Sequence, residues 1–314
     1  MKRVFLFPGQ GSQYAGMGKS LAENFSIAKA VFAEADDVLG FALSKLCFEG
    51  PEDELRLTEN TQPALVATSI AALEVLKQHG HSADAVAGHS LGEYSALIAA
   101  GSLTFADALR LVRKRGRYMQ HAVPAGVGAM AALLKLPDGK LDEILSEAAQ
   151  GEVVTAANLN SPDQIVIAGN AGAVRRAMEL AKAAGAKRAV PLTVSAPFHC
   201  PLMAPAQQKL KVDLDATNFQ DLAIPLVNNW NAKLITSGQE ARQGLYEQVP
   251  NPVQWTASMR LLIEHGATEW IEVGAGNVLG GLLKNIDSNH RAKKFGEAAD
   301  LDQLEFGQGT ANGA

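Results

Sequence analysis

The sequence has few cysteines, few aromatic residues and no excess of positive charge. Cys47 and Cys200 are its two cysteines, and their spacing fits neither a metal site nor a disulfide framework. The net charge of −5 argues against non-specific binding to nucleic acid. We therefore expect a protein of a reducing compartment, without a metal centre and without a nucleic-acid partner. A cytoplasmic location is the simplest expectation.

Long hydrophobic runs are also missing. No run approaches the ~18–20 apolar residues that cross a membrane, and the first apolar run, Val4–Phe7, is too short for the core of a signal peptide. The 314 residues are 47% hydrophobic and 19% charged, which is typical of a globular protein with a sizeable core. Such a length suits one large domain with an insertion, or two domains. We expect no membrane association, and a monomer.

Strand and helix patterns alternate along most of the chain, which predicts an α/β fold. Asn60 is the expected N-cap of one helix, and Thr104 and Asp107 are spaced as in a capping box at the start of another. The expected strands are Val4–Phe7, Ala85–Ala87, Ile224–Asn228 and Glu269–Val273. The expected helices are Ser26–Leu39, Asn60–His79, Glu93–Ala100, Thr104–His121, Leu202–Leu214, Val253–His265 and Asn277–Ile286.

The middle of the chain follows the order β-α-β-β-α-β, which is the pattern of a ferredoxin-like unit. We therefore expect a small ferredoxin-like domain at residues 127–196, inserted into a discontinuous catalytic domain of residues 1–126 and 197–294. Residues 295–314 have little apolar pattern and are expected to form a flexible tail. The predicted elements of the insertion are strand Ala129–Leu136, helix Leu141–Ala149, strands Val153–Leu159 and Gln164–Ala168, helix Ala173–Ala184 and strand Arg188–Val194.

The most informative motif is Gly88-His89-Ser90-Leu91-Gly92, a Gly-x-Ser-x-Gly nucleophile elbow. A short apolar strand precedes it and a helix-forming run follows it, which is the setting that this motif requires. The turn presents the serine hydroxyl at a helix N-terminus, where free N–H groups favour a developing oxyanion. The pattern indicates a nucleophile at Ser90, although an ordinary turn serine is the alternative.

A serine nucleophile needs a base, and His199 is the best candidate among seven histidines. It follows an expected strand and lies between Pro197 and Pro201, which would stiffen the loop and fix the imidazole. His89 is adjacent to Ser90 in an extended backbone and is a poor candidate. The alternative is that His199 is an ordinary loop histidine. No Asp or Glu stands out as its orienting partner.

Arg115 lies on the apolar face of the helix expected at Thr104–His121, whereas the other basic residues of that helix lie on the polar face. A guanidinium on an inward face is unfavourable unless it is paired. Either a core acid forms a structural salt bridge with Arg115, or the side chain binds a carboxylate or phosphate of a substrate. The sequence pattern alone leaves both open.

Two glycine-rich turns complete the candidates. Gly9-Gln10-Gly11 follows the first strand, lacks the lysine of a P-loop and could bring a backbone N–H close to a reacting oxyanion. The run from Gly274 to Gly280 misses the dinucleotide fingerprint, because its third glycine comes one residue late. It is interpreted as a close strand-to-helix turn, and no nucleotide cofactor is expected.

Four motifs together resemble the malonyl-CoA:acyl carrier protein transacylases of type II fatty acid synthesis. They are FPGQGSQ at residues 7–13, GHSLGEY at 88–94, PFH at 197–199 and NPVQW at 251–255. The resemblance runs in the same order from the first strand to about Ile286. It implies an α/β-hydrolase-like large domain carrying a ferredoxin-like small domain, in agreement with the pattern above.

The resemblance implies roles for single residues. Ser90 would carry the malonyl group as an ester, and His199 would take and return the proton. The resemblance implies that the main-chain carbonyl of Gln248 orients the imidazole of His199. The N–H groups of Gln10 and Leu91 would form the oxyanion hole. The implied substrate-binding residues are Arg115, which would hold the malonate carboxylate, Phe198, which would exclude branched acyl groups, and Asn160 and Gln164 near the cleft.

The resemblance also implies the partners: malonyl-CoA and a phosphopantetheinylated acyl carrier protein, with no bound cofactor. Carrier proteins are acidic and this chain is net negative, so docking would need a local basic patch. The candidates are Arg175, Arg176, Lys182, Lys187 and Arg188, and then Lys284, Arg291, Lys293 and Lys294. Alternatives are a discrete acyltransferase that serves a polyketide synthase, a serine esterase or thioesterase, and a non-enzymatic carrier-docking subunit.

Overall fold

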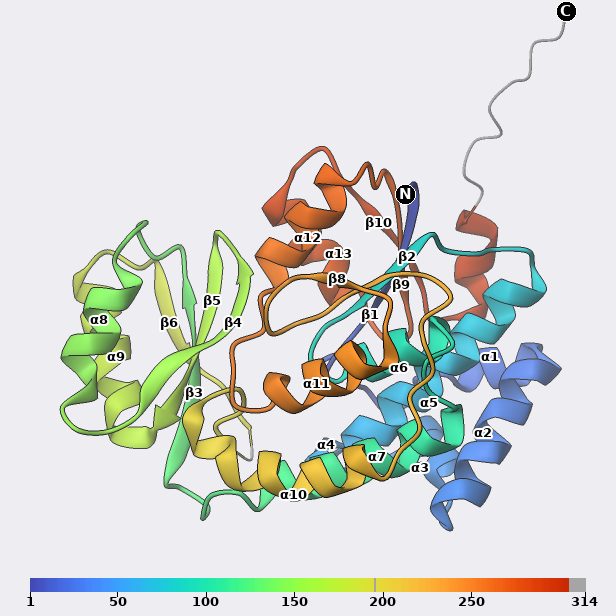
Figure 1. Cartoon of the computed structure of the whole chain (residues 1–314), viewed down its shortest axis with the longest axis horizontal. Coiled ribbons are helices and arrows are strands. Elements are labelled where there is room, and N and C mark those ends of the chain that lie inside the picture. Colours follow the sequence, from blue (N-terminus) through green and yellow to red (C-terminus); the bar gives the residue numbers. More distant parts are fainter. Residues whose placement is uncertain (195, 305–314) are drawn as a thin grey trace, which may run out of the picture.

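The fold is built on two β-sheets, one mostly parallel and one antiparallel (Figure 1). The computed structural model describes residues 1–194 and 196–304. The large sheet has six strands in the order β10-β9-β1-β2-β7-β8. All neighbours are parallel except β7 and β8. The strands are β1 (Arg3–Phe7), β2 (Ala85–Gly88), β7 (Leu226–Val227), β8 (Leu234–Ile235), β9 (Glu269–Val273) and β10 (Ala292–Phe295).

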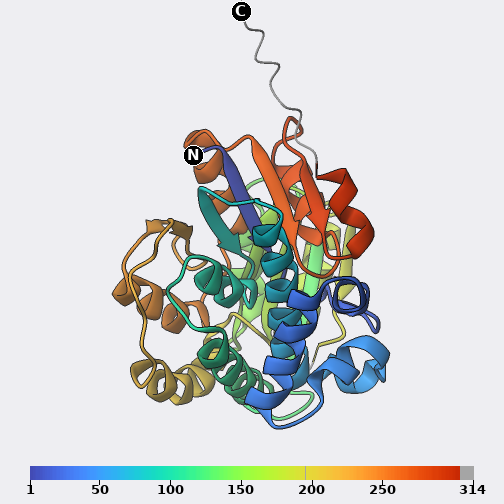
Figure 2. The same cartoon turned by 90° about the vertical axis from the view of Figure 1, so that its right-hand side faces the viewer.

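Helices cover this sheet, as expected for parallel strands that are buried on both faces (Figure 2). The helices before the insertion are α1 (Lys19–Asn24), α2 (Ser26–Leu39), α3 (Leu43–Glu49), α4 (Glu52–Arg56), α5 (Thr58–Gln78), α6 (Gly92–Ala99) and α7 (Phe105–Gln120). Those after it are α10 (Ala204–Asp215), α11 (Gly238–Gln248), α12 (Trp255–Glu264) and α13 (Val278–Ile286). Short 3-10 helices lie at Pro201–Met203 and Ala298–Gln303.

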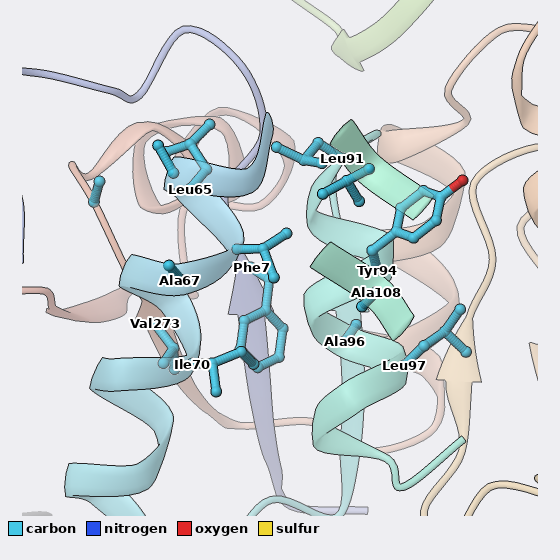
Figure 3. Packing of buried hydrophobic residues seen from close by; sticks show 14 of the residues in the cluster. Phe7, Leu65, Ala67, Ile70, Leu91, Tyr94, Ala96, Leu97, Ala108 and Val273 are labelled. Atoms are coloured by element: carbon cyan, nitrogen blue, oxygen red, sulfur yellow. The ribbon is translucent and has the colours of Figure 1, made fainter. Parts of the chain in front are cut away.

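The core around the end of β1 holds the elbow in place. Phe7 is fully buried, and Figure 3 shows its ring between side chains of α5, such as Ile70, and side chains of α6, such as Ala96. α5 is buried along almost its whole length, so it is a central helix without a polar stripe. Because β1 and β2 are neighbours, their carboxyl ends meet at one edge, where ligands of open parallel sheets usually bind.

The second sheet has four antiparallel strands in the order β4-β5-β3-β6. It lies to one side of the large sheet in Figure 1, and two helices pack on it through their small apolar residues. Its elements are β3 (Gly128–Leu134), α8 (Leu141–Ala149), β4 (Val154–Ser161), β5 (Gln164–Asn170), α9 (Ala171–Ala183) and β6 (Arg188–Pro191). The order β-α-β-β-α-β predicted from the sequence is confirmed, and so is the α/β fold class.

Thr104 is confirmed as a helix N-cap, because its hydroxyl accepts from the N–H of Asp107 at 3.1 Å. The prediction for Asn60 is wrong. Helix α5 begins at Thr58 after Leu57, so Asn60 lies inside the first turn. Its amide instead donates to the carbonyl of Glu54 at 2.8 Å, so the side chain links two helices rather than capping one.

The predicted tail at residues 295–314 is wrong for residues 295–304. Phe295 is the last residue of β10, which pairs in parallel with β9. Phe295 and Leu304 are buried. Asp300 accepts from the N–H groups of Gly296 at 3.1 Å and Glu297 at 3.0 Å. Two lysines made β10 hard to find, since charged residues are typical of edge strands. Residues 305–314 lie outside the described part of the chain.

Candidate active site

The elbow forms at the carboxyl end of β2, as the motif predicts. Ser90 has φ of 51°, in the left-handed region that non-glycine residues rarely adopt. Gly92 permits this turn, because a Cβ atom there would lie 2.0 Å from the carbonyl oxygen of Phe7. Gly9 lets the neighbouring loop approach, since its Cβ would lie 2.3 Å from the carbonyl oxygen of His89. The close packing of β1 against the elbow therefore depends on these glycines.

Replacing Gly92 by alanine is expected to lower the free energy of unfolding by more than about 2 kcal/mol, because β1 and α6 must separate to admit the methyl group. Gly281 in α13 is the matched control, with open space at its Cβ position. Gly281→Ala should stabilise the protein by up to about 1 kcal/mol, the helix-propensity difference. Urea unfolding of both variants checks this, and equal midpoints would contradict the account of the elbow.

Ser90 and His199 meet although they are far apart in the sequence. The Ser90 Oγ atom lies 2.7 Å from Nε2 of His199, and Nδ1 of His199 lies 2.9 Å from the carbonyl oxygen of Gln248. A carbonyl can only accept, so Nδ1 carries the proton and Nε2 is free to accept from the serine hydroxyl. Among the residues that the structure describes, no carboxylate contacts this imidazole, and a main-chain carbonyl orients it instead.

Burial, with the nearby positive charge of Arg115, lowers the pKa of His199 to about 3. The imidazole is therefore neutral and able to act as a base far below its usual titration range. We expect kcat/KM for serine acylation to stay level as the pH falls through 6.5, the ordinary pKa of histidine. A pH profile of acylation measures this, and an acid limb centred near pH 6.5 would contradict it.

Arg115 lies in the same cluster and is 1% exposed. One of its terminal nitrogens, Nη2, donates to Ser90 Oγ at 3.2 Å and to Oε1 of the Gln248 side chain at 2.8 Å. Burial lowers the pKa of Arg115. In the described part of the chain, Arg115 forms no ion pair, and its buried Nε has no hydrogen-bond partner. Within these described residues, no core acid is in contact with Arg115, as a structural salt bridge would require.

The side chains behind the serine were not predicted. Glu93 in the first turn of α6 accepts from Nε2 of Gln248 at 2.6 Å and from the N–H of Asn229 at 3.2 Å. The Asn229 side chain in turn accepts from the N–H of Ser90 at 2.6 Å and donates to the carbonyl of Gly88 at 2.7 Å. Burial raises the pKa of Glu93 to about 7. Asn229 could have been found, because it follows a buried strand at the carboxyl edge of the sheet.

A cavity of about 110 Å³ opens above the serine. Ser90, His199 and Arg115 all line it, together with Gln10 and Leu91. Within residues 1–194 and 196–304, the backbone N–H groups of Gln10 and Leu91 have no hydrogen-bond acceptor. Two unpaired donors beside the Ser90 hydroxyl are what an oxyanion hole needs. The remaining lining residues are Gln62, His89, Met119, Met130, Asn158, Leu192, Val194 and Phe198.

Asn160 and Gln164 do not line this cavity. The Oδ1 atom of Asn160 lies 2.8 Å from Nε2 of His89, and its amide donates to Gln164 at 3.0 Å. The ring of His89 also packs on Trp255, with centroids 5.2 Å apart. Asn160 therefore contacts His89, which lines the cavity, and Gln164 contacts Asn160. The asparagine of this strand that lines the cavity is Asn158.

Metal ligands and membrane-spanning helices are not found among the same described residues. They contain no group of three or more His, Cys, Asp or Glu side chains placed to hold a metal ion. No described helix is both long enough and apolar enough to span a bilayer. Cys47 and Cys200 are both buried free thiols.

Comparison with known proteins agrees with this geometry. A model of the acyl transferase domain matches residues 4–286. The malonyl CoA-acyl carrier protein transacylase of Bacillus subtilis strain 168 is 52% identical over 306 residues, which are 97% of this chain and 96% of that protein. An acyl carrier protein S-malonyltransferase from Vibrio cholerae superposes with a TM-score of 0.95 at 45% identity, covering 97% of this chain and 100% of that one.

A third relative was solved together with a carrier protein. The malonyl transacylase PlMCAT, in complex with the type II polyketide acyl carrier protein AntF, matches with a TM-score of 0.94 at 46% identity. The match covers 96% of this chain and 98% of that one.

The fold, the elbow serine and the matched domain define an acyl transferase. Within that class, the chain belongs to the family of malonyl CoA-acyl carrier protein transacylases.

Proposed function

We propose that the protein transfers the malonyl group from malonyl-CoA to the phosphopantetheine thiol of acyl carrier protein, through a malonyl ester on Ser90. One observation supports this most strongly: a single serine oxygen lies 2.7 Å from the His199 imidazole and 3.2 Å from the Arg115 guanidinium, inside one small cavity. The imidazole makes the oxygen nucleophilic, and the guanidinium is placed for an acyl group that ends in a carboxylate.

In the first half-reaction, Ser90 Oγ attacks the thioester carbonyl carbon while its proton passes to Nε2 of His199. The carbonyl oxygen becomes an oxyanion that accepts from the N–H groups of Gln10 and Leu91. One such donor is worth ~2.7–4 kcal/mol in the transition state. The C–S bond then breaks, and His199 returns the proton to the departing thiolate. The main-chain carbonyl of Gln248 keeps the imidazole oriented throughout.

Arg115 supplies the selectivity for malonyl. Its guanidinium is a planar fork that matches a carboxylate with two parallel hydrogen bonds. An incoming malonate carboxylate replaces the neutral acceptors Ser90 Oγ and Gln248 Oε1 with a charged one, so both partners of the hydrogen bonds are then ionised. An acetyl group offers no such exchange and leaves the buried guanidinium without a new partner. Malonyl is therefore favoured over neutral acyl groups such as acetyl.

In the second half-reaction, the pantetheine thiol takes the place of coenzyme A and attacks the serine ester. The cavity wall includes Met119, Met130 and Phe198, whose apolar side chains offer few hydrogen-bond partners to water. Phe198 is 8% exposed, and its bulk would crowd a branched acyl group. A second hollow of about 670 Å³ shares Gln10, Leu192 and Val194 with the first, so a pantetheine arm common to both thioesters has a route to the serine.

Docking of an acidic carrier protein needs basic residues that are not already engaged. Arg176 donates to the carbonyl of Ala148 at 2.8 Å, and Lys294 pairs with Asp300 at 3.1 Å. Lys187 and Arg188 are exposed at the start of β6 in the small sheet and are the better candidates. A cytoplasmic, monomeric enzyme without a resident cofactor remains our prediction.

Mass spectrometry of the intact protein tests the proposed function. Incubation with malonyl-CoA should add one malonyl group at Ser90. Pantetheine or carrier protein should discharge that adduct far faster than water does. Rapid hydrolysis without a preference for the thiol would instead favour the esterase, and no adduct at all would favour a carrier-docking subunit without catalysis.

The carrier is the carrier protein of fatty acid synthesis in our proposal, and a polyketide carrier is the second candidate because the matched PlMCAT was solved with one. Steady-state transfer to each carrier at matched concentration separates the two. A kcat/KM that is higher for the polyketide carrier would reassign the pathway without changing the chemistry.

A further inference from the structure

The position of the Arg115 guanidinium depends on a neutral partner. Its Nη2 donates to the Gln248 side chain at 2.8 Å, and Gln248 is fully buried. The other end of the same amide donates from Nε2 to Glu93 at 2.6 Å and to the carbonyl of Ser90 at 2.9 Å. The Gln248 amide therefore stands between Arg115 and the buried carboxyl group of Glu93, and it contacts both.

The chemistry of the two neighbours fixes the orientation of this amide. A guanidinium only donates hydrogen bonds, so it requires the oxygen of Gln248. The carboxylate of Glu93 and the carbonyl of Ser90 accept, so they require the nitrogen. A flipped amide would place its nitrogen against Arg115 and its oxygen against two acceptors. The orientation seen is the one that satisfies all three contacts.

We propose that Glu93 is a positioning residue for Arg115, acting through the side chain of Gln248. This inference rests on the proposed function. Glu93 holds the amide nitrogen, and the amide oxygen then holds the guanidinium beside Ser90 before the substrate arrives. Because the group in contact with Arg115 is a neutral amide, a malonate carboxylate displaces it without competing against another carboxylate.

Separation of the two charges explains why the site is ready to bind an anion. If Glu93 contacted Arg115 directly, the buried pair would be strong and the substrate carboxylate would have to break it. With one amide between them, Glu93 still favours the charged form of Arg115, while the guanidinium keeps donors for the substrate. Through this amide Glu93 acts on selectivity for the acyl group, whereas its contact with the N–H of Asn229 affects both acyl groups alike.

The test is the ratio of kcat/KM for malonyl-CoA to kcat/KM for acetyl-CoA. Glu93→Ala should lower this ratio about tenfold or more, as expected for a hydrogen bond to a charged group. Glu93→Gln should restore most of the ratio, because its amide oxygen can still accept from Gln248. Gln248→Leu keeps the main-chain carbonyl but removes the amide, and should lower the ratio as much as Glu93→Ala does. Combining Glu93→Ala with Gln248→Leu should cause no further loss.

Glu272 provides the matched control. It is also a fully buried glutamate, and it accepts from the N–H groups of Leu279 at 3.0 Å and Gly280 at 2.8 Å, outside the active-site cavity. Glu272→Ala should lower the melting temperature and leave the ratio unchanged.

An unchanged ratio in Glu93→Ala, or an equal loss for both acyl groups, would overturn the inference. If Glu93→Ala does not fold, Gln248→Leu decides, and an unchanged ratio there would overturn it equally. A wild-type protein that fails to transfer malonyl would refute the proposed function itself, which is a separate result.

Discussion

Replacing Ser90 by alanine is expected to abolish the malonyl adduct and to reduce transfer to carrier protein by several orders of magnitude. In the proposed mechanism the serine oxygen forms the bond to the acyl group, and removing a nucleophile alone typically costs nearly as much as removing the nucleophile, base and orienting residue together. Intact-mass measurement after incubation with malonyl-CoA gives the result directly.

Ser95→Ala is the control for this experiment. Ser95 lies on α6, the helix that follows the elbow, and is buried, with 1% of its surface exposed, but it does not line the cavity. That variant should acquire the adduct like the wild type. Alanine in place of Ser90 keeps the Cβ atom, so the backbone strain at φ of 51° is the same in the variant. An adduct that persists in a folded Ser90→Ala protein would refute the assignment of the nucleophile.

Replacing Arg115 by alanine is expected to reduce kcat/KM for malonyl-CoA by about a hundredfold or more. The buried pair between the guanidinium and the malonate carboxylate is lost, and ~1.4 kcal/mol corresponds to a factor of ten. Acetyl-CoA should be affected much less, because its acyl group makes no charged contact and no longer meets an unpaired guanidinium. Kinetics with both thioesters measure the change in selectivity.

Two further substitutions sharpen the result. Arg115→Lys keeps the charge but loses the planar fork, so it should recover only part of the activity. Arg113→Ala is the matched control on the same helix, because Arg113 contacts the ring of Phe41 and the side chain of Asn60 rather than the cavity. A malonyl preference that survives in Arg115→Ala would contradict the role of this residue.

Local patterns in the sequence predicted most of the fold. Elements with a clear hydrophobic period and clear signals at their ends were placed well. Helix Ser26–Leu39 and strand Glu269–Val273 have the predicted bounds. Helix α5 begins two residues before Asn60, because an asparagine can also satisfy its amide in a tertiary contact. Strand β10 was missed since its two lysines suppress the apolar signal and only the partner strand shows that it belongs to a sheet.

Site residues, too, could be predicted only where a local pattern indicates them. Ser90 could be predicted because the elbow is a local motif, and Arg115 because its helix shows a stripe. The contacts behind them could not, since they join residues that are distant in sequence: Ser90 and Asn229 are separated by 139 positions, and Glu93 and Gln248 by 155. No pattern in a single sequence shows which glutamine side chain will meet which glutamate. The family resemblance named Gln248 for its carbonyl, and the structure adds a second use of the same residue.

The most direct test of the account is the structure of the malonylated enzyme, from crystals treated with malonyl-CoA. We predict a malonyl ester on Ser90 Oγ, its carbonyl oxygen near the N–H groups of Gln10 and Leu91. Its free carboxylate should accept hydrogen bonds of about 2.7–2.9 Å from Arg115, the usual length for such a charged pair. A carboxylate that points out toward solvent, with Arg115 still on Gln248, would contradict the account.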